Sequence, residues 1–347
     1  IPLEGTPGPL NAITDLPGIE VGYTTLVEGE STRTGVTILH PRGKANHDPV
    51  FGGWFPLNGN GELTGAAWLE EGGFLEGPVG LTNTHSVGIV RDTIIAWQVK
   101  NNCLFQLWST PLVTETADGW LNDMYAQHVQ PEHVWAALDS AQPGPLAEGN
   151  VGGGTGMICY EFKGGTGTAS RHLPAKFGGY TVGALVQANF GRRFQLSVAG
   201  VPVGQHLTEN AVFTSGENPF RETGSLVTIL ATDAPLLPYQ LKRIARRGAI
   251  GMARTGGMAG NGPGDLFLAF STANSGAARP ESGVASVQAL PNDRLDPLFM
   301  AAAYATEEAI LNALLAAETM TGRDGLTIPA LPHNQLQALL RQYNRLA

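Results

Sequence analysis

The apolar run from Leu226 to Leu230 constrains the fold of this chain more than any other feature. It is an almost unbroken series of apolar and β-branched residues, which is typical of a strand buried on both faces. The tripeptide Thr223-Gly224-Ser225 comes directly before it. Ser225 therefore begins a core strand, and the glycine before it places no Cβ next to the serine hydroxyl.

The Gly224-Ser225 peptide has two interpretations. It is either an ordinary dipeptide that opens a core strand, or a site at which the chain cuts itself. In the second case the Ser225 hydroxyl attacks the Gly224 carbonyl, the acyl group shifts from N to O, and water cleaves the ester. Ser225 then gains a free α-amine, with an ordinary pKa near roughly 7.7, that can serve as general base for its own hydroxyl. The dipeptide alone favours the first interpretation, because short motifs often match by chance.

Composition excludes several classes of function. The chain has 347 residues, of which 42% are hydrophobic and 15% charged, and its net charge is -9. An acidic balance argues against a nucleic-acid partner, since phosphate binding needs clustered Lys and Arg. Two cysteines, Cys103 and Cys159, fit neither a disulfide framework nor a metal cluster and are expected in the core. No apolar stretch is predicted to approach the length of a membrane span.

The sequence opens at Ile1 rather than at a methionine. A removed signal peptide and a trimmed start are both compatible with this, so the compartment stays open between cytoplasm and periplasm.

Strand and helix signals occur in both halves of the chain. Because strands of both halves carry candidate site residues, we expect one domain, 1–347, with helices layered on sheet. Strands are predicted at 35–39, 79–90, 181–191, 226–230 and 266–270, and helices at 91–101, 131–141, 235–254, 297–318 and 334–345.

Two glycine-rich segments are candidates for a binding site. The first, 51–65, combines tight turns with aromatic residues and is either a pocket rim or a plain surface loop. The second, 151–171, gathers glycines around Lys163, but the order typical of a phosphate-binding loop is absent. A substrate site lined by backbone is the better interpretation of the second segment.

The residues around the other polar candidates predict the kind of structure in which each candidate lies. Asn189 ends a predicted strand, where its amide can act as a hydrogen-bond donor at the edge of a sheet. Residues 114–123, which include Glu115, are predicted to form a turn-rich loop. His85 has no cysteine or carboxylate at metal-ligand spacing, so a structural role is expected. Residues 204–222 lack periodicity and are predicted to be an exposed, flexible connector.

Six motifs together resemble one known family: GSLVTILATDAPLLP, NGNGELTG, LTNTHSVG, YEFKGGTG, VQANFG and DLFLAFSTAN. They resemble the L-aminopeptidase/D-amino-acid esterases and β-peptidyl aminopeptidases, a family that also contains nylon-oligomer hydrolases. The resemblance implies an α/β fold, a four-layer α-β-β-α sandwich. It also implies self-cleavage into an α chain, 1–224, and a β chain, 225–347, and a homotetramer of such αβ units without metal or cofactor.

The resemblance also implies roles for individual residues. Ser225 matches the N-terminal nucleophile, and Gly224 matches the residue before the cut. Asn189 matches the amide that holds the oxyanion, and Lys163 matches a lysine kept near the nucleophile. Glu115 matches the acid that, in β-aminopeptidases, binds the free amine of the substrate.

Two positions depart from the family pattern. Where members carry a hydroxyl or acid, one residue, and then an acid, this chain reads Pro263-Gly264-Asp265. The acid is kept as Asp265, but proline cannot donate a hydrogen bond, so Asn261 or a water is expected to substitute. Ala117 stands where relatives carry an aromatic hydroxyl or an aliphatic residue, which predicts an open, apolar wall of the substrate pocket.

The predicted function is a self-processing serine aminopeptidase acting on short peptides, amides or esters of L-amino acids, D-alanine or β-amino acids. One alternative is an impaired member of the family that persists as a non-catalytic protein, with Pro263 as its only positive support. The other is acyl transfer of the ornithine acetyltransferase type. Those enzymes use threonine as the nucleophile, so Ser225 favours hydrolysis.

Overall fold

The computed structural model describes residues 1–212, 222, 224–279, 281 and 283–346. Thr223 and most of the predicted connector, 213–221, therefore lie outside the described residues. Two sheets dominate the fold. The first has the strand order β1-β2-β5-β6, formed by β1 (Glu20–Glu28), β2 (Thr32–His40), β5 (Val79–Asn83) and β6 (Leu112–Thr116). The second has the order β4-β3-β12-β11-β10-β9, formed by β3 (Val50–Pro56), β4 (Phe74–Leu75), β9 (Gly165–His172), β10 (Thr181–Asn189), β11 (Ser225–Thr232) and β12 (Leu266–Ser271).

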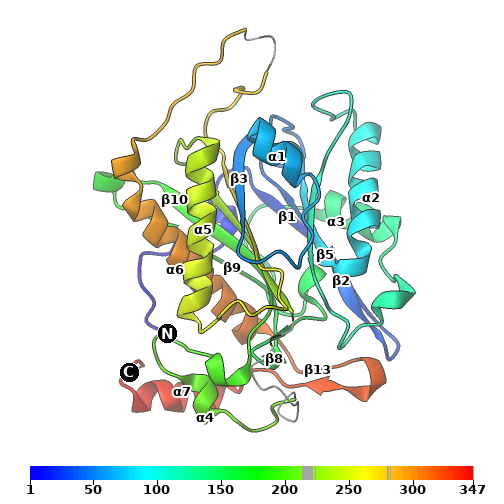
Figure 1. Cartoon of the computed structure of the whole chain (residues 1–347), viewed down its shortest axis with the longest axis vertical. Coiled ribbons are helices and arrows are strands. Elements are labelled where there is room, and N and C mark those ends of the chain that lie inside the picture. The colour runs from blue at the N-terminus through cyan, green and yellow to red at the C-terminus, as the bar shows by residue number, and fades with distance from the viewer. Residues whose placement is uncertain (213–221, 223, 280, 282, 347) are drawn as a thin grey trace.

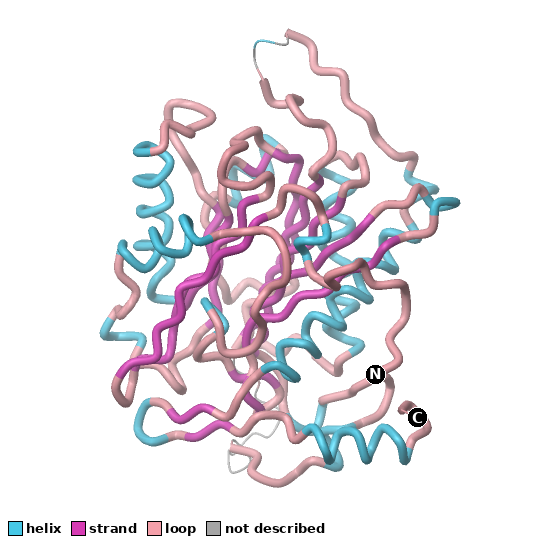
Figure 2. Tube along the Cα trace, turned by 180° about the vertical axis from the view of Figure 1, so that it is seen from behind, coloured by secondary structure: helices cyan, strands magenta, loops and turns pink. Residues whose placement is uncertain are grey.

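Helices cover the outer face of each sheet (Figures 1 and 2). α2 (Val87–Lys100) and α3 (Pro131–Ser140) share an apolar cluster with β2 of the first sheet. α5 (Pro238–Arg254) and α6 (Asp296–Ala316) pack on the second sheet. A further cluster joins the two inner sheet faces, and these four layers confirm the predicted α-β-β-α sandwich. The remaining elements are α1 (Ala66–Gly72), α4 (Val203–His206), α7 (His333–Gln342), β7 (Ile158–Cys159), β8 (Phe162–Lys163), β13 (Met320–Thr321) and β14 (Thr327–Ile328).

β11 has the burial that its sequence predicts. All eight of its residues are buried, because successive side chains point to opposite faces and both faces are covered. Leu226 and Leu230 pack in the cluster under α5 and α6. Val227, Ile229 and Ala231 pack between the two sheets. The apolar run is uninterrupted because both faces of this strand meet apolar layers.

Two sequence predictions for the first sheet are wrong. β5 ends at Asn83 rather than continuing to residue 90, because the Asn83 side chain accepts the His85 N–H at 3.0 Å and turns the chain. His85, which follows this turn, is exposed and its ring packs on that of Tyr125. Residues 114–116 belong to strand β6 instead of a loop, and Glu115 pairs with Thr82 of β5.

The prediction that no apolar stretch has the length of a membrane span is also wrong. α6 has 21 residues and a mean hydropathy of 1.3, which satisfies that test of length and composition. However, 72% of its apolar window is buried inside the protein. Its apolar side chains pack against β9, β10 and α5, so α6 is a core helix of this fold.

Candidate active site

Ser225 lies at the start of β11, between the end of β10 and the start of β12. Its partner in the antiparallel β10–β11 register is Asn189. The Ser225 Oγ accepts a hydrogen bond from the backbone N–H of Gly264, at 2.9 Å. Only 6% of the residue is exposed. The hydroxyl is therefore held by the segment before β12, close to the end of β10.

Gly224 has a backbone conformation that favours glycine. Its φ is +105°, in the left-handed region. A Cβ at this position would stand 2.0 Å from the carbonyl oxygen of Asn189 and 3.1 Å from its Nδ2. No other residue fits so close to β10. The peptide before Ser225 is thus in contact with the Asn189 amide.

The Asn189 side chain is held in one orientation. Its Oδ1 accepts the N–H of Ile158 at 2.8 Å, and its Nδ2 donates to the carbonyl of Ala117 at 2.9 Å. An amide nitrogen carries two hydrogens, so Nδ2 has a second one beyond the bond to Ala117. Gly224 lies beside this amide nitrogen, since a Cβ on Gly224 would stand 3.1 Å from Nδ2.

Asp265 is fully buried behind the nucleophile. One carboxylate oxygen accepts the N–H of Leu226 at 2.8 Å, and the other accepts the side-chain amide of Asn58 at 3.0 Å. Burial raises the pKa of Asp265 from 3.8 to about 6, the two hydrogen bonds oppose that rise, and the charge of Glu222 adds to it. The carboxylate therefore supports the first residues of β11.

The raised pKa of Asp265 predicts a pH dependence of stability. Between roughly pH 4 and 6 the folded chain holds a proton that the unfolded chain has lost, so the free energy of unfolding falls as pH rises through this window. A shift from 3.8 to about 6 corresponds to about 3 kcal/mol. We expect Asp265→Asn, made in a Ser225→Ala background, to lack this loss of stability.

Urea unfolding of the two proteins near about pH 4 and near about pH 7 measures this effect. Other titrating groups are common to both chains and cancel in the comparison. A difference in stability that is the same at both pH values would contradict the assignment.

Pro263 offers no side-chain donor next to Asp265. The hydrogen bond to Ser225 comes from the Gly264 backbone, and a polar partner of Asp265 is Asn58. The Asn261 side chain is exposed. Substitution for the missing donor by Asn261 or by a water stays a prediction.

Lys163 is fully buried, but its ammonium is bound within its own loop. Among the described residues, Nζ donates to the carbonyls of Met157 and Gly164, each at 2.9 Å, and of Gly154 at 3.4 Å. Burial lowers the pKa of Lys163 to about 7, against the attraction of Cys159 and Asp118. The structure connects Lys163 to Ser225 only indirectly, because the loop that Lys163 holds also contains Ile158, whose N–H binds the Asn189 side chain.

Glu115 lies in β6 with only 4% of its surface exposed. One carboxylate oxygen accepts the N–H of Glu62 at 3.0 Å, and the other accepts the hydroxyl of Thr84. Burial raises the pKa of Glu115, and the hydrogen bonds from Thr84 and Glu62 oppose this. Two residues further on, the carbonyl of half-buried Ala117 binds the Asn189 amide. Glu115 is therefore two residues away from a residue that contacts the Asn189 side chain.

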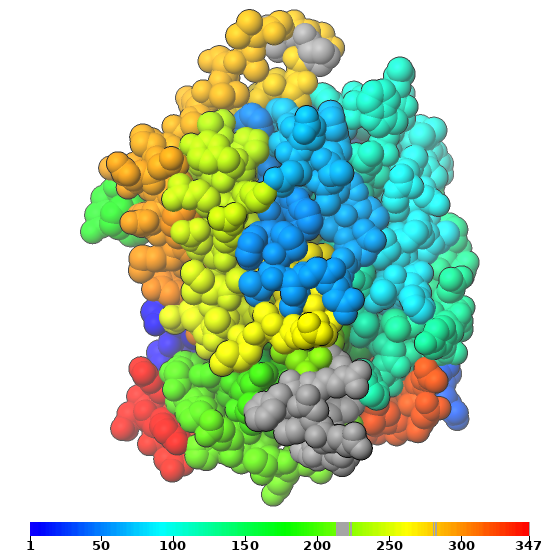
Figure 3. Space-filling view, viewed as in Figure 1, coloured from blue at the N-terminus to red at the C-terminus, as the bar shows by residue number. Residues whose placement is uncertain are grey.

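Segments that are far apart in the sequence meet at this site. Figure 3 shows residues near 58–65 beside the segment that precedes β12. Asn58 donates to the Gly260 carbonyl at 3.2 Å, and Asn60 donates to that of Gly262. Within the described part of the chain, no group of three or more His, Cys, Asp or Glu is placed to hold a metal ion.

Comparison with known proteins shows the family of the chain. The sequence profile of Peptidase family S58 matches residues 11–328. The chain belongs to peptidase family S58. This S58 chain is 50% identical over 366 residues to the β-peptidyl aminopeptidase BapA of Sphingosinicella microcystinivorans, covering 100% of this chain and 92% of the relative.

Solved structures match the S58 chain over its whole length. The L-aminopeptidase D-Ala-esterase/amidase of Ochrobactrum anthropi, a prototype of the serine aminopeptidases with a variant of the Ntn-hydrolase fold, has a TM-score of 0.94 and 45% identity. That match covers 100% of this chain and 98% of the other. A β-aminopeptidase of Burkholderia sp. has a TM-score of 0.89 and 49% identity, covering 98% and 96%. The chain is an aminopeptidase, and the resemblance found in its motifs is confirmed.

Sequence reasoning missed four residues that support the candidate site from outside it. Asn58 and Thr84 lie within the quoted motifs NGNGELTG and LTNTHSVG, which were the available signal for them. Gly264 acts through its backbone N–H, which no residue pattern reveals. Glu222 lies in a polar, aperiodic stretch, yet only 3% of it is exposed.

Proposed function

We propose that this S58 aminopeptidase cuts its own chain between Gly224 and Ser225, then uses Ser225 to release N-terminal residues from short peptides, amides or esters. The juxtaposition of Ser225 Oγ, the Gly224 peptide and the Asn189 amide at the start of β11 supports this best. The products would be an α chain, 1–224, and a β chain, 225–347, that together form one domain. Homotetramers of these αβ units, expected from the family resemblance, belong to the same proposal.

Self-cleavage begins with attack of Ser225 Oγ on the carbonyl carbon of Gly224. The C–N bond breaks as the amide nitrogen takes the Oγ proton, which leaves an ester and a free α-amine. Asn189 Nδ2 stabilises the oxyanion that forms between these steps. Water then hydrolyses the ester, releasing the Gly224 carboxylate and regenerating the Ser225 hydroxyl.

Turnover repeats the same attack on a substrate. The new α-amine of Ser225 takes the Oγ proton while Oγ bonds to the acyl carbon. The proton then passes to the leaving amine or alcohol, and an acyl-enzyme remains. Water attacks that ester and its proton returns, by way of the α-amine, to Oγ. Asn189 stabilises the oxyanion in both halves of the cycle.

The substrate class follows from the relatives and from two side chains. The matched proteins are named as β-peptidyl aminopeptidases and as an L-aminopeptidase D-Ala-esterase/amidase. We infer that this chain acts on the same range: L-amino acids, D-alanine and β-amino acids. Glu115 would bind the substrate ammonium, a strong charge-assisted contact. The small side chain of Ala117 would leave room for the longer β-amino backbone.

Intact mass measurement and a panel of L-Ala, D-Ala and β-Ala amides test this function together. We expect two fragments that part between Gly224 and Ser225, and hydrolysis of at least one amide. An intact chain that hydrolyses none of them would refute the proposal and favour a non-catalytic role. Acetyl transfer from acetylornithine to glutamate, in place of hydrolysis, would favour the transferase alternative.

Glu115→Gln is expected to lower kcat/KM for free-amine substrates by about ten- to a hundred-fold. The variant keeps the shape but removes the charge that binds the ammonium, and a hydrogen bond to a charged group contributes roughly 1.5–3 kcal/mol. N-acetylated amides carry no ammonium and should gain relative to free ones. Self-cleavage uses no substrate amine, so splitting of the chain should proceed normally.

Thr84→Val provides the matched control, because it removes one hydrogen bond from Glu115 and leaves the charge. Its kcat/KM for free amines should stay close to that of the parent. If Glu115→Gln hydrolyses alanine and β-alanine amides at the parental rate, the acid that selects the free amine lies elsewhere.

A further inference from the structure

We propose that Glu222 is a positioning residue for the cut at Gly224-Ser225, an inference that rests on the self-cleavage proposed above. Glu222 stands two residues before Gly224, and only 3% of it is exposed. One carboxylate oxygen accepts the N–H of Gly191 at 2.9 Å, and the other accepts the N–H of Gly260 at 3.0 Å. Both oxygens are thus bound by backbone donors from two separate segments.

These two segments carry the groups that surround Ser225. Gly191 follows Asn189 by two residues, at the end of β10. Gly260 precedes Gly264, whose N–H binds the Ser225 hydroxyl. A Cβ on Gly260 would lie 2.9 Å from the Glu222 Cβ, so the glycine permits this close approach. The carboxylate therefore joins the segment before the cut to both sides of the nucleophile.

Burying the Glu222 carboxylate is unfavourable in free energy, and packing gives no reason for an acid at this position. A buried carboxylate is destabilising unless it is hydrogen-bonded or paired. Asp265 lies near enough for the negative charge of Glu222 to raise its pKa further. Two acids in one buried site repel each other. A carboxylate held in such a place, next to the peptide to be cut, is consistent with a role in holding that peptide.

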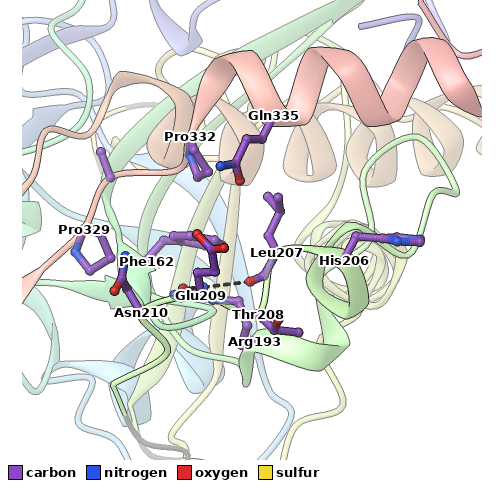
Figure 4. A pocket seen from close by; sticks show the side chains of 11 residues that line it. Phe162, Arg193, His206, Leu207, Thr208, Glu209, Asn210, Pro329, Pro332 and Gln335 are labelled. Carbon is purple, nitrogen blue, oxygen red and sulfur yellow. Dashed lines mark hydrogen bonds between the residues drawn. The ribbon is translucent and has the colours of Figure 1, made fainter.

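Arg193 anchors the chain on the other side of residues 213–221. Its guanidinium donates to the carbonyls of Leu207 at 2.9 Å and Glu209 at 3.0 Å, and Figure 4 shows the bond to Leu207. Arg193 follows Gly191 by two residues, so described residues on both sides of 213–221 attach to the same turn after β10. That turn begins directly after the Asn189 amide. These contacts hold Leu207, Glu209 and Glu222 at the turn after β10, and none of the groups that make them takes part in the reaction.

The role of Glu222 should be confined to self-cleavage. The bonds of Asn189 to Ile158 and Ala117, and of Asp265 to Asn58, do not involve residue 222, so we expect them to persist after the cut. A substrate reaches Ser225 without being joined to residue 222. Loss of the carboxylate should therefore slow the cut and leave kcat and KM of the cleaved molecules nearly unchanged.

The test follows splitting of the full-length chain over time by mass spectrometry, in Glu222→Gln, Glu222→Asp and the parent. Glutamine must turn its NH₂ toward one of the two N–H donors, so we expect splitting to slow by about ten- to a hundred-fold, as for loss of one bond to a charged group. Aspartate keeps the charge and should be faster than glutamine. Glu307→Gln is the matched control, since Glu307 is also 3% exposed but pairs with Arg254 on the outer layer.

Each result has a distinct meaning. Slow splitting of Glu222→Gln with parental kinetics per cleaved molecule supports the proposal. Parental splitting of Glu222→Gln overturns it, as does equal slowing in Glu307→Gln, which would indicate a general effect on stability. An unsplit parent chain would refute self-cleavage itself, and the role of Glu222 with it.

Discussion

A Ser225→Ala chain is expected to remain in one piece and to lose aminopeptidase activity. The variant lacks the Oγ that would attack the Gly224 carbonyl, so no ester forms and no α-amine is released. Without that amine and hydroxyl, substrates meet neither the nucleophile nor its base. Loss of the nucleophile in a serine peptidase lowers kcat on the order of 10⁶-fold, so residual turnover should not be measurable. The fold should persist, because alanine fits the same buried strand position.

Mass spectrometry and amide hydrolysis check this expectation together. Ser271→Ala is a suitable control, because it also removes a buried hydroxyl from the same sheet, one bonded to the Ala234 carbonyl at 2.6 Å. That chain should split and hydrolyse amides. A Ser225→Ala protein that still parts after Gly224 would exclude the proposed mechanism.

Asn189→Asp is expected to reduce kcat by about 10²- to 10³-fold, the usual effect of losing one oxyanion donor. The aspartate can still accept the N–H of Ile158, so the local fold is kept. Its second oxygen, however, would face the Ala117 carbonyl and repel the negative charge that develops on the substrate. Self-cleavage passes through the same oxyanion and should slow with turnover.

Rates of splitting and of amide hydrolysis in the purified variant measure both effects. Asn312→Asp is the control, since Asn312 also donates its amide to a backbone carbonyl, that of Thr168 at 2.8 Å, but does so from α6. It should split and turn over normally. If Asn189→Asp slows turnover but splits at the parental rate, the two reactions use different oxyanion donors.

The sequence predicted those parts of the fold in which buried positions carry apolar residues. The predicted strand 226–230 lies within β11, Ser225–Thr232. Asn189 was correctly predicted to end a strand, because most residues of β10 before it are apolar. β6 was missed because Glu115 and its neighbours are polar, although they are buried in the strand. The hydrogen-bond partners of Glu115, which are Glu62 and Thr84, belong to segments remote in the sequence. The residue pattern around position 115 therefore does not predict these hydrogen bonds.

Residues of the candidate site were predictable where a sequence motif contains a single polar side chain that could belong to the site. Ser225, Asn189 and Asp265 lie together in the structure. Lys163 does not join them directly, because burial turns its ammonium toward the carbonyls of its own loop. Contacts made through backbone N–H groups, such as that of Gly264, depend on the fold rather than on residue type.

The strand order of the second sheet has a consequence for the two fragments that a cut before Ser225 creates. β11 and β12 would belong to the shorter fragment, and they lie side by side between β3 and β10 of the longer one. The shorter fragment would thus pair with the longer one on both sides, through the backbone hydrogen bonds of β11 with β10 and of β12 with β3. Dissociation of the two fragments would break both of these strand pairs at the same time. A cut before Ser225 would therefore leave both fragments in one sheet, with the inner strands already paired by the single chain from which they came.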